Sequence, residues 1–343
     1  MPNPVITRAI DRLMSREDLS VEDTSAVLAE IMQGNASEVE TAGVLVALRT
    51  KGETVEEIEG LARTMRRFAT PVDAGIDDLV DTAGTGGGRP TFNVSTTAAL
   101  IAAGAGCSVA KHGNRSATGL SGSADLLEAL GVRIDLAPDA VARCIREVGF
   151  GFMFAPAHHS ATRYVIPVRK ELAVRTIFNF LGPLTNPAGA TRQVIGVSDP
   201  AFLDTMAGAL ARLGARRALV VSSADGLDEL STSGTTRVVE VAGGELRTYE
   251  VSPEDVGLTR AAPDAIGGGT PDANAATTRR ILAGQPGPER DLALLNAGAA
   301  VYVGGAVDSL GEGVARAAEA VDSGAAARAL DALTAMTATL SAG

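Results

Sequence analysis

The sequence predicts an α/β protein with two parts: a small N-terminal all-α domain, and a large α/β domain with a mostly parallel central sheet and helices on both faces. Three observations predict this fold. The first seventy residues carry apolar side chains at helical spacing between clear helix boundaries. From residue 79 onward, short apolar strands alternate with helical segments. The length of 343 residues suits about two domains, and hydrophobic residues make up 45% of the chain, enough to form their cores.

Four helices are expected in the N-terminal part, within residues 5–13, 20–34, 37–52 and 54–71. Ser37 with Glu40, and Thr54 with Glu57, have the spacing of capping boxes. Helices this short do not bury two faces by themselves, so this part is expected to pack against a partner subunit.

The remainder shows the strand–helix alternation that is typical of a parallel sheet covered on both faces. Strands are expected at 79–83, 108–110, 150–155, 192–197 and 218–222, and helices at 95–105, 125–130 and 202–213. Two alternating runs flank Gly243-Gly244 within residues 237–251, which predicts a β-hairpin. Ala-rich helices are expected from Pro271 onward.

Composition excludes several classes of protein. The formal net charge of −11 argues against binding of nucleic acid or of an anionic membrane surface. Two cysteines cannot build a disulfide framework, which favours a reducing, cytoplasmic location. No apolar run reaches the roughly 18–20 residues of a membrane span, and the N-terminus is charged where a signal peptide is apolar.

A glycine-rich segment, Gly84-Thr85-Gly86-Gly87-Gly88, lies between an expected strand and an expected helix. Consecutive glycines expose backbone N–H groups and let a phosphate approach closely, although a flexible turn explains them equally well. It is neither a P-loop nor a dinucleotide fingerprint, because no Gly-Lys-Ser/Thr follows and Arg89 replaces the last glycine. In the next segment, Ser95 and Thr96 are expected to cap the helix, with free N–H groups facing the same crevice.

Charged and polar residues at other expected strand ends complete the candidate site. Lys111 is one of only three lysines; as a point charge at a strand end it suits a phosphorylated substrate. Ser121-Gly122-Ser123 precedes another helix and offers a further anion site. Asp228 and Glu229 suit Mg²⁺, or form a solvated acidic loop. Arg169 suits a substrate carboxylate. His158 and His159 are expected to be exposed loop residues without a catalytic role.

Seven motifs occur in one order along nearly the whole chain: GTGG with FNVST, KHGNRS, SGSADLLEALG, PVRKEL, RTIFNFLGPLTNPAG and GLDEL. Together they resemble the anthranilate phosphoribosyltransferase family of tryptophan biosynthesis. The resemblance implies transfer of the phosphoribosyl group of phosphoribosyl pyrophosphate (PRPP) to the amine of anthranilate. It also implies Mg²⁺ and a homodimer joined through the α-domain. The implied domains are 1–71, with a returning segment near 165–185, and 72–164 with 186–343.

The resemblance also implies roles by motif position. PRPP is expected to contact Gly84, Thr85, Gly87, Gly88, Thr91, Asn93, Val94, Ser95, Thr96, Lys111, His112, Gly113, Asn114, Arg115, Ser116, Thr118, Gly119 and Ser123. Anthranilate is expected to contact Gly84, His112, Asn114 and Arg169. Mg²⁺ is expected at Ser95, Asp228 and Glu229. No protein nucleophile is expected, and an acid–base role for His112 is left open.

The sequence departs from the family pattern at four positions. Gly88 stands where an aspartate is usual, and Leu120 stands where a basic residue is common. Ser160 replaces a proline, and Ser222 replaces a histidine. The first two bear on how many Mg²⁺ ions bind and how tightly. Gly88 and Leu120 leave open a phosphoribosyltransferase for another aromatic amine. A second alternative is an enzyme like the pyrimidine nucleoside phosphorylases, which look similar in architecture.

Overall fold

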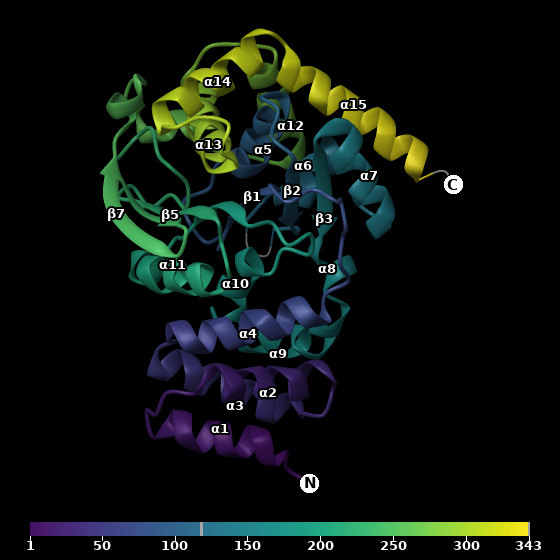
Figure 1. The fold of residues 1–343 in the computed structure, drawn as a ribbon, viewed down its shortest axis with the longest axis vertical. Helices are drawn as coiled ribbons and strands as arrows, with labels where there is room; N and C mark the ends of the chain where they lie inside the picture. Colours follow the sequence, from purple (N-terminus) through teal and green to yellow (C-terminus); the bar gives the residue numbers. More distant parts are fainter. Residues whose placement is uncertain (117–118, 342–343) are drawn as a thin grey trace.

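Four helices form the N-terminal part of the computed structural model, which describes residues 1–116 and 119–341. They are α1 Pro4–Met14, α2 Val21–Met32, α3 Glu38–Lys51 and α4 Val55–Phe68. Ser37 and Thr54 cap α3 and α4, and both predicted capping boxes are formed. Two later segments, a 3-10 turn at Ser160–Tyr164 and the helix α9 Ile166–Leu172, pack against α2 and α3. This part forms one end of the molecule (Figure 1).

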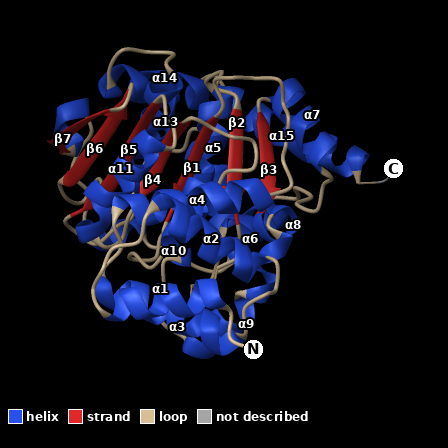
Figure 2. Ribbon diagram, turned by 60° about the horizontal axis from the view of Figure 1, so that its bottom comes forward, coloured by secondary structure: helices blue, strands red, loops and turns tan. Residues whose placement is uncertain are grey.

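A seven-stranded sheet forms the centre of the molecule, with the order β3-β2-β1-β4-β5-β6-β7 (Figure 2). The strands are β1 Val80–Gly84, β2 Val109–Gly113, β3 Phe150–Phe154, β4 Arg192–Gly196, β5 Arg217–Ser223, β6 Thr236–Ala242 and β7 Glu245–Val251. The first five run parallel, and β6 and β7 are antiparallel neighbours. Gly243 and Gly244 both have positive φ, as a two-residue hairpin turn requires. The predicted sheet and hairpin are confirmed.

Helices cover both faces of the sheet, and the strand residues alternate between two apolar cores. Val194 and Leu219 face α5 and α13, whereas Ile195 and Val220 face α11 and the N-terminal helices. The helices of the larger part, in chain order, are α5 Val94–Gly104, α6 Ser123–Ala129, α7 Pro138–Val148, α8 Ala155–His158, α10 Phe178–Leu181, α11 Leu203–Arg212, α12 Pro271–Leu282, α13 Pro288–Gly304, α14 Leu310–Asp322 and α15 Ala325–Leu340.

Two segments differ from the expected elements. The strand expected at 108–110 extends through Gly113, so Lys111 and His112 lie inside β2 rather than in the loop after it. Residues 138–172, for which only one strand was expected, also contain α7, α8 and α9. Pro138 and Pro167 stand in the first turn of α7 and α9, where proline is tolerated because the missing N–H would have no helical partner.

Candidate active site

The carboxyl ends of β1, β2, β4 and β5 meet at one edge of the sheet, as parallel strands dictate. The loops that leave this edge carry most of the residues singled out in the sequence. The glycine segment begins at the last residue of β1, residues 114–116 and 119–122 follow β2, and Asp228 and Glu229 follow β5. We call this edge the candidate site.

The glycine segment lies directly against Asp228. Thr85 N–H donates to Gly196 O at 2.9 Å, which holds the segment on the end of β4. A Cβ atom at Gly84 would lie 3.0 Å from Asp228 Oδ2, and a Cβ atom at Gly88 would lie 2.5 Å from Asp228 Oδ1. The loop that carries Asp228 and Glu229 (the acidic loop) and the segment Gly84–Gly88 (the glycine loop) therefore form one surface. Gly84 and Gly88 leave room there for the Asp228 carboxylate.

Arg175 and Ser198 also contact the glycine segment, and the sequence did not single out this role for either. Arg175 Nη1 donates to Gly86 O at 2.8 Å, and its guanidinium lies where a side chain at Gly87 would collide with it. Ser198 Oγ donates to the same carbonyl at 2.8 Å, and Thr85 Oγ1 accepts from Ser198 N–H at 3.2 Å. Arg175 lies in the quoted RTIFNF motif, but spacing alone does not show that it reaches a loop ninety residues earlier.

The start of α5 differs from the expected capping. Asn93, not Ser95 or Thr96, is the N-cap residue; it has a left-handed φ of 64°, and its side chain caps no helical N–H. The Asn93 amide instead bonds Ser121 and Asn274, which ties three segments together. Val94 and Thr96 are buried, and Ser95 is partly exposed. The first-turn N–H groups of Val94 and Ser95 have no helical acceptor, which makes this helix start favourable for an anion. The Ser95 N–H donates to the chain's own Glu229 carboxylate.

Lys111 is buried, and this corrects the expectation of an ammonium exposed to ligand. Its side chain is 1% exposed and crosses from β2 to β1, where Nζ donates to Thr82 O at 2.5 Å. Nζ also lies 3.5 Å from Ser95 Oγ. Burial lowers the pKa of Lys111, opposed by the charges of Asp81 and Glu229. The Lys111 amine therefore lies beneath the site, next to Ser95.

Asp228 and Glu229 lie on the same side of the sheet as Lys111. Burial raises the pKa of Asp228. Burial, followed by repulsion from Asp228, raises the pKa of Glu229 to about 8, opposed by Lys111 and the Ser95 N–H. Two adjacent carboxylates that resist ionisation together are stabilised by a divalent cation. Among the described residues no three His, Cys, Asp or Glu side chains cluster into a metal cage. This donor set, two carboxylates and the Ser95 hydroxyl, fits Mg²⁺, which keeps waters and shares substrate phosphates.

All three histidines of the chain are buried, contrary to the expectation that His158 and His159 are exposed. The rings of His112 and His159 lie 5.0 Å apart. His112 Nδ1 is 3.2 Å from Gly182 O, and its Nε2 has no hydrogen-bond partner among the described residues. Burial, then the nearby His159, lowers the pKa of His112 to about 3. His112 is therefore neutral at pH 7.

The loop after β2 is held mainly by α6. Arg115 donates to Asp125 at 2.8 Å and to Glu128 at 2.9 Å, so its charge is paired away from the glycine segment. Asp125 also accepts from the Gly122 N–H at 2.8 Å. Asp125, in the first turn of α6, thus caps the N–H of Gly122, and the predicted anion site at Ser123 stays a prediction.

Several other predicted contacts lie in the described part of the same region. Gly113 packs on Phe152 and Ser123, and Asn114 is exposed and accepts from the Arg115 N–H at 2.7 Å. Ser116 Oγ accepts from the Gly119 N–H at 2.7 Å. Thr118 lies outside the described residues. Thr91, partly buried, precedes α5 with its carbonyl packed on Gly268.

Arg169 lies on α9, in the helical part, where its guanidinium packs over the Phe178 ring at 5.6 Å. No hydrogen bond or ion pair joins it to Gly84, His112 or Asn114 within residues 1–116 and 119–341. The predicted anthranilate contacts therefore come from two parts of the chain, and their joint role in binding stays a prediction.

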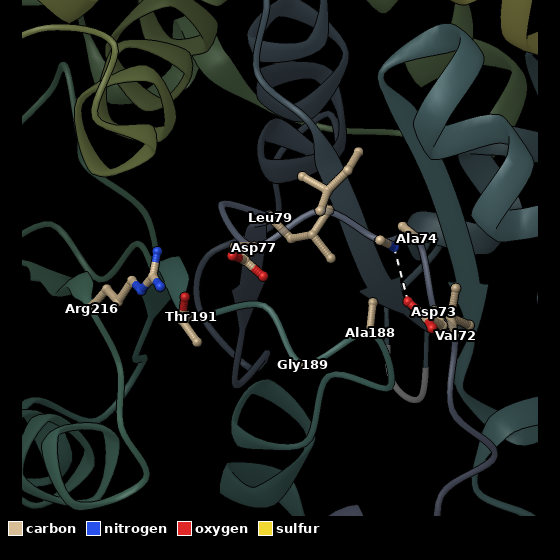
Figure 3. A pocket seen from close by; sticks show the side chains of 11 residues that line it. Val72, Asp73, Ala74, Asp77, Leu79, Ala188, Gly189, Thr191 and Arg216 are labelled. Atoms are coloured by element: carbon tan, nitrogen blue, oxygen red, sulfur yellow. Dashed lines mark hydrogen bonds between the residues drawn. The ribbon is translucent and has the colours of Figure 1, made fainter.

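A pocket of about 330 Å³ lies at the opposite edge of the sheet (Figure 3). Leu79, Thr191 and Arg216 line it, and these residues immediately precede β1, β4 and β5. The pocket is therefore at the amino ends of the strands, separate from the candidate site.

Comparison with known proteins identifies the family. Residues 76–327 match the glycosyl transferase family, a/b domain, and residues 7–69 match the helical bundle domain of the same family. The chain is 53% identical to the anthranilate phosphoribosyltransferase of Rubrobacter xylanophilus over 329 residues, covering 95% of this chain and 96% of that one. The chain belongs to the anthranilate phosphoribosyltransferase family. The predicted family, fold and enzyme class are confirmed.

Solved structures of anthranilate phosphoribosyltransferases agree with this assignment. The enzyme from Thermus thermophilus is 49% identical and superposes with a TM-score of 0.91, covering 96% of this chain and 99% of that one. The enzyme from Saccharomyces cerevisiae, solved in complex with PRPP and Mg, is 28% identical, with a TM-score of 0.89 over 97% of this chain and 98% of that one.

Proposed function

We propose that this chain transfers the phosphoribosyl group of PRPP to the amine of anthranilate, giving N-(5-phosphoribosyl)anthranilate and pyrophosphate. The observation that carries the proposal is the meeting of three features at the candidate site. These are the glycine loop, the first turn of α5, and the acidic pair at Asp228 and Glu229 with Lys111 beneath. Backbone N–H groups at a glycine loop and a helix start suit a diphosphate.

The reaction needs stabilisation of separating charge rather than a protein nucleophile. Breaking the bond between ribose C1 and pyrophosphate places negative charge on the leaving group and positive charge on the sugar. The α5 start, Lys111 from below and Arg175 on the glycine loop all favour the departing anion. Asp228 and Glu229 would hold Mg²⁺ together with Ser95, and the ion would neutralise pyrophosphate oxygens.

Positioning of anthranilate supplies the remaining acceleration. An aryl amine is a weak nucleophile, so its placement against C1 matters more than a base. Arg169 would bind the carboxylate through its guanidinium fork, and Asn114 and His112 would contact the ring. Because His112 is neutral at pH 7, it can donate or accept one hydrogen bond but does not supply a positive charge.

We also infer a homodimer through the helical part. Four of the large apolar side chains that are strongly exposed lie on or beside α1, α3 and α9: Met14, Val39, Val46 and Ile166. Exposed apolar groups gathered on one part of a surface mark an interface.

A cytoplasmic location agrees with two buried, unpaired cysteines. No helix of the described ranges is long and apolar enough to cross a membrane.

The decisive experiment mixes the protein with PRPP, Mg²⁺ and anthranilate and follows anthranilate fluorescence. We expect the fluorescence to fall, and Arg169→Ala to raise the KM for anthranilate while leaving that for PRPP nearly unchanged. A panel of substituted anthranilates separates anthranilate from other aromatic amines as acceptor. Unchanged fluorescence at saturating substrates would refute the proposed reaction.

A further inference from the structure

Residues 88 and 89 hold the acidic loop against the glycine loop. Arg89 N–H donates to Gly226 O at 3.0 Å, and Arg89 Nη2 lies 3.4 Å from Asp225 Oδ2. The Arg89 and Asp225 side chains are 30% and 12% exposed, so the pair is shielded from solvent more than an ordinary surface pair. One backbone bond and one ion pair thus join the two loops immediately before Asp228.

Gly88 lets the two loops approach each other closely because it has no side chain. Its φ is not positive, so the backbone there does not require glycine. A Cβ atom at this position, however, would lie 2.5 Å from Asp228 Oδ1 and 2.9 Å from Asp228 N. Any side chain at position 88 must therefore displace Asp228 or the loop that carries it.

Asp225, the partner of Arg89, is also bonded to the rest of the acidic loop. Its Oδ2 accepts from Ser231 Oγ at 2.8 Å, and its Oδ1 accepts from the Leu227 N–H at 3.3 Å. Both of these bonds stay within the stretch that follows β5. The ion pair to Arg89 is the Asp225 contact that reaches the glycine loop, and so it fixes the acidic loop relative to the candidate site.

We propose that Gly88 and Arg89 are positioning residues for the metal-binding carboxylates: Gly88 admits Asp228, and Arg89 anchors the Asp228–Glu229 loop through Asp225. The inference rests on the proposed function, in which these two carboxylates hold Mg²⁺. Groups that orient metal ligands from behind commonly change metal affinity when removed. Arg89 does not touch the substrates in this account.

Metal binding tests the role of Arg89 without turnover. Mn²⁺ is titrated into the purified full-length protein, and the free ion is followed by electron paramagnetic resonance. We expect Arg89→Ala to raise the Mn²⁺ dissociation constant by about tenfold, Arg89→Lys to restore most of the affinity, and Asp225→Asn to behave like Arg89→Ala. The Mg²⁺ concentration for half-maximal rate should rise in parallel, whereas the KM for anthranilate should not change.

Arg290→Ala is the matched control, because it removes a partly buried arginine paired with Asp322 at 2.7 Å in the N-terminal half of α13. Wild-type Mn²⁺ affinity in Arg89→Ala, or an equal loss in Arg290→Ala, would overturn the proposal. If Arg89→Ala does not fold, Asp225→Asn and Arg89→Lys decide the question alone. Asp225→Asn with wild-type affinity would then also overturn it.

Gly88→Ala tests the steric half of the proposal. We expect it to weaken Mn²⁺ binding, whereas Gly311→Ala, where a Cβ atom meets nothing within 4 Å, should have no effect. Equal affinities for the two variants would contradict the role of Gly88. Failure here is distinct from failure of the proposed reaction: a protein that consumes anthranilate, and whose Mn²⁺ affinity is the same in wild type, Arg89→Ala and Gly88→Ala, refutes the positioning role only. Mn²⁺ shifts without anthranilate consumption refute the reaction only.

Discussion

At the scale of single residues, the environment of each ionisable group decides what it can do. Lys111 and His112 are adjacent in β2 and both buried, but different polar groups surround their side chains. Lys111 has the carbonyl of Thr82 and the charges of Asp81 and Glu229, whereas His112 faces His159. His159 has no hydrogen-bond partner on either ring nitrogen within the described part of the chain. Burial therefore favours the neutral form of both histidines.

The free energy of unfolding should therefore depend on the protonation of these histidines. Burial lowers the pKa of His159 to about 4 and that of His112 to about 3. The unfolded chain gains a proton at each histidine as the pH falls below about 6.5, while the folded protein does not. Each group thus removes up to about 1.4 kcal/mol of stability per pH unit until its folded pKa is reached.

Urea unfolding between pH 7 and pH 5 measures this slope in wild type and in His159→Asn. We expect the stability of wild type to fall more steeply with decreasing pH than that of the variant. Glu229 has a raised pKa and acts in the opposite sense, since it favours lower pH, but it is present in both proteins and cancels in the comparison. Val168→Ala, a buried and uncharged change, should shift the whole curve without changing its slope. Parallel curves for wild type and His159→Asn would contradict the prediction.

At the scale of elements, local sequence signals predicted helix starts in the N-terminal part but not at the site. Ser37 and Thr54 cap their helices because the capping box is a contact between residues three apart. The start of α5 failed the same rule, because Asn93 bonds Ser121 and Asn274, far away in the sequence. The burial of Lys111 and the contact of Arg175 with the glycine loop likewise depend on which strands are neighbours. The family motifs located the site, but long-range pairing decided how its side chains are used.

The two capping boxes look equivalent in sequence and should differ in energy. Glu57 is fully buried; it accepts from the Leu19 N–H at 2.9 Å and pairs with Lys51 at 3.0 Å. Glu57→Ala removes one of the two carboxylates that pair with Lys51 and leaves the buried Leu19 N–H without this acceptor, so we expect a loss of about 2 kcal/mol in the free energy of unfolding. Glu40, the equivalent residue of α3, is partly exposed and accepts from the Ser37 N–H at 2.9 Å and the Asn3 N–H at 2.6 Å, and Glu40→Ala should cost less. Equal losses in urea unfolding would show that burial of Glu57 is not what matters.

At the scale of the whole molecule, the helical part and the sheet share one apolar core. A single cluster joins Leu28 and Ile58 of the N-terminal helices to Ile195 and Val220 of the sheet. Arg66 reinforces the junction by donating to Leu184 O at 2.7 Å. The division of the chain at residue 71 stays a prediction, since no break in the core marks it. Because the inner face of the helical part is used up in this contact, its outer face is the one left to bind a partner subunit.

The proposed dimer can be tested by placing a charge on that outer face. Val46 lies on α3 and is 46% exposed, whereas Leu246 lies on β7, at the far edge of the sheet, with a similar exposure of 49% (Figure 1). Buried in a subunit interface, a glutamate at position 46 would lose its hydration without gaining a partner. We expect Val46→Glu to reduce the mass measured by light scattering from that of a dimer to that of a monomer, and Leu246→Glu to leave it unchanged. A wild-type monomer, or a dimer that survives Val46→Glu but not Leu246→Glu, would move the interface away from the helical part.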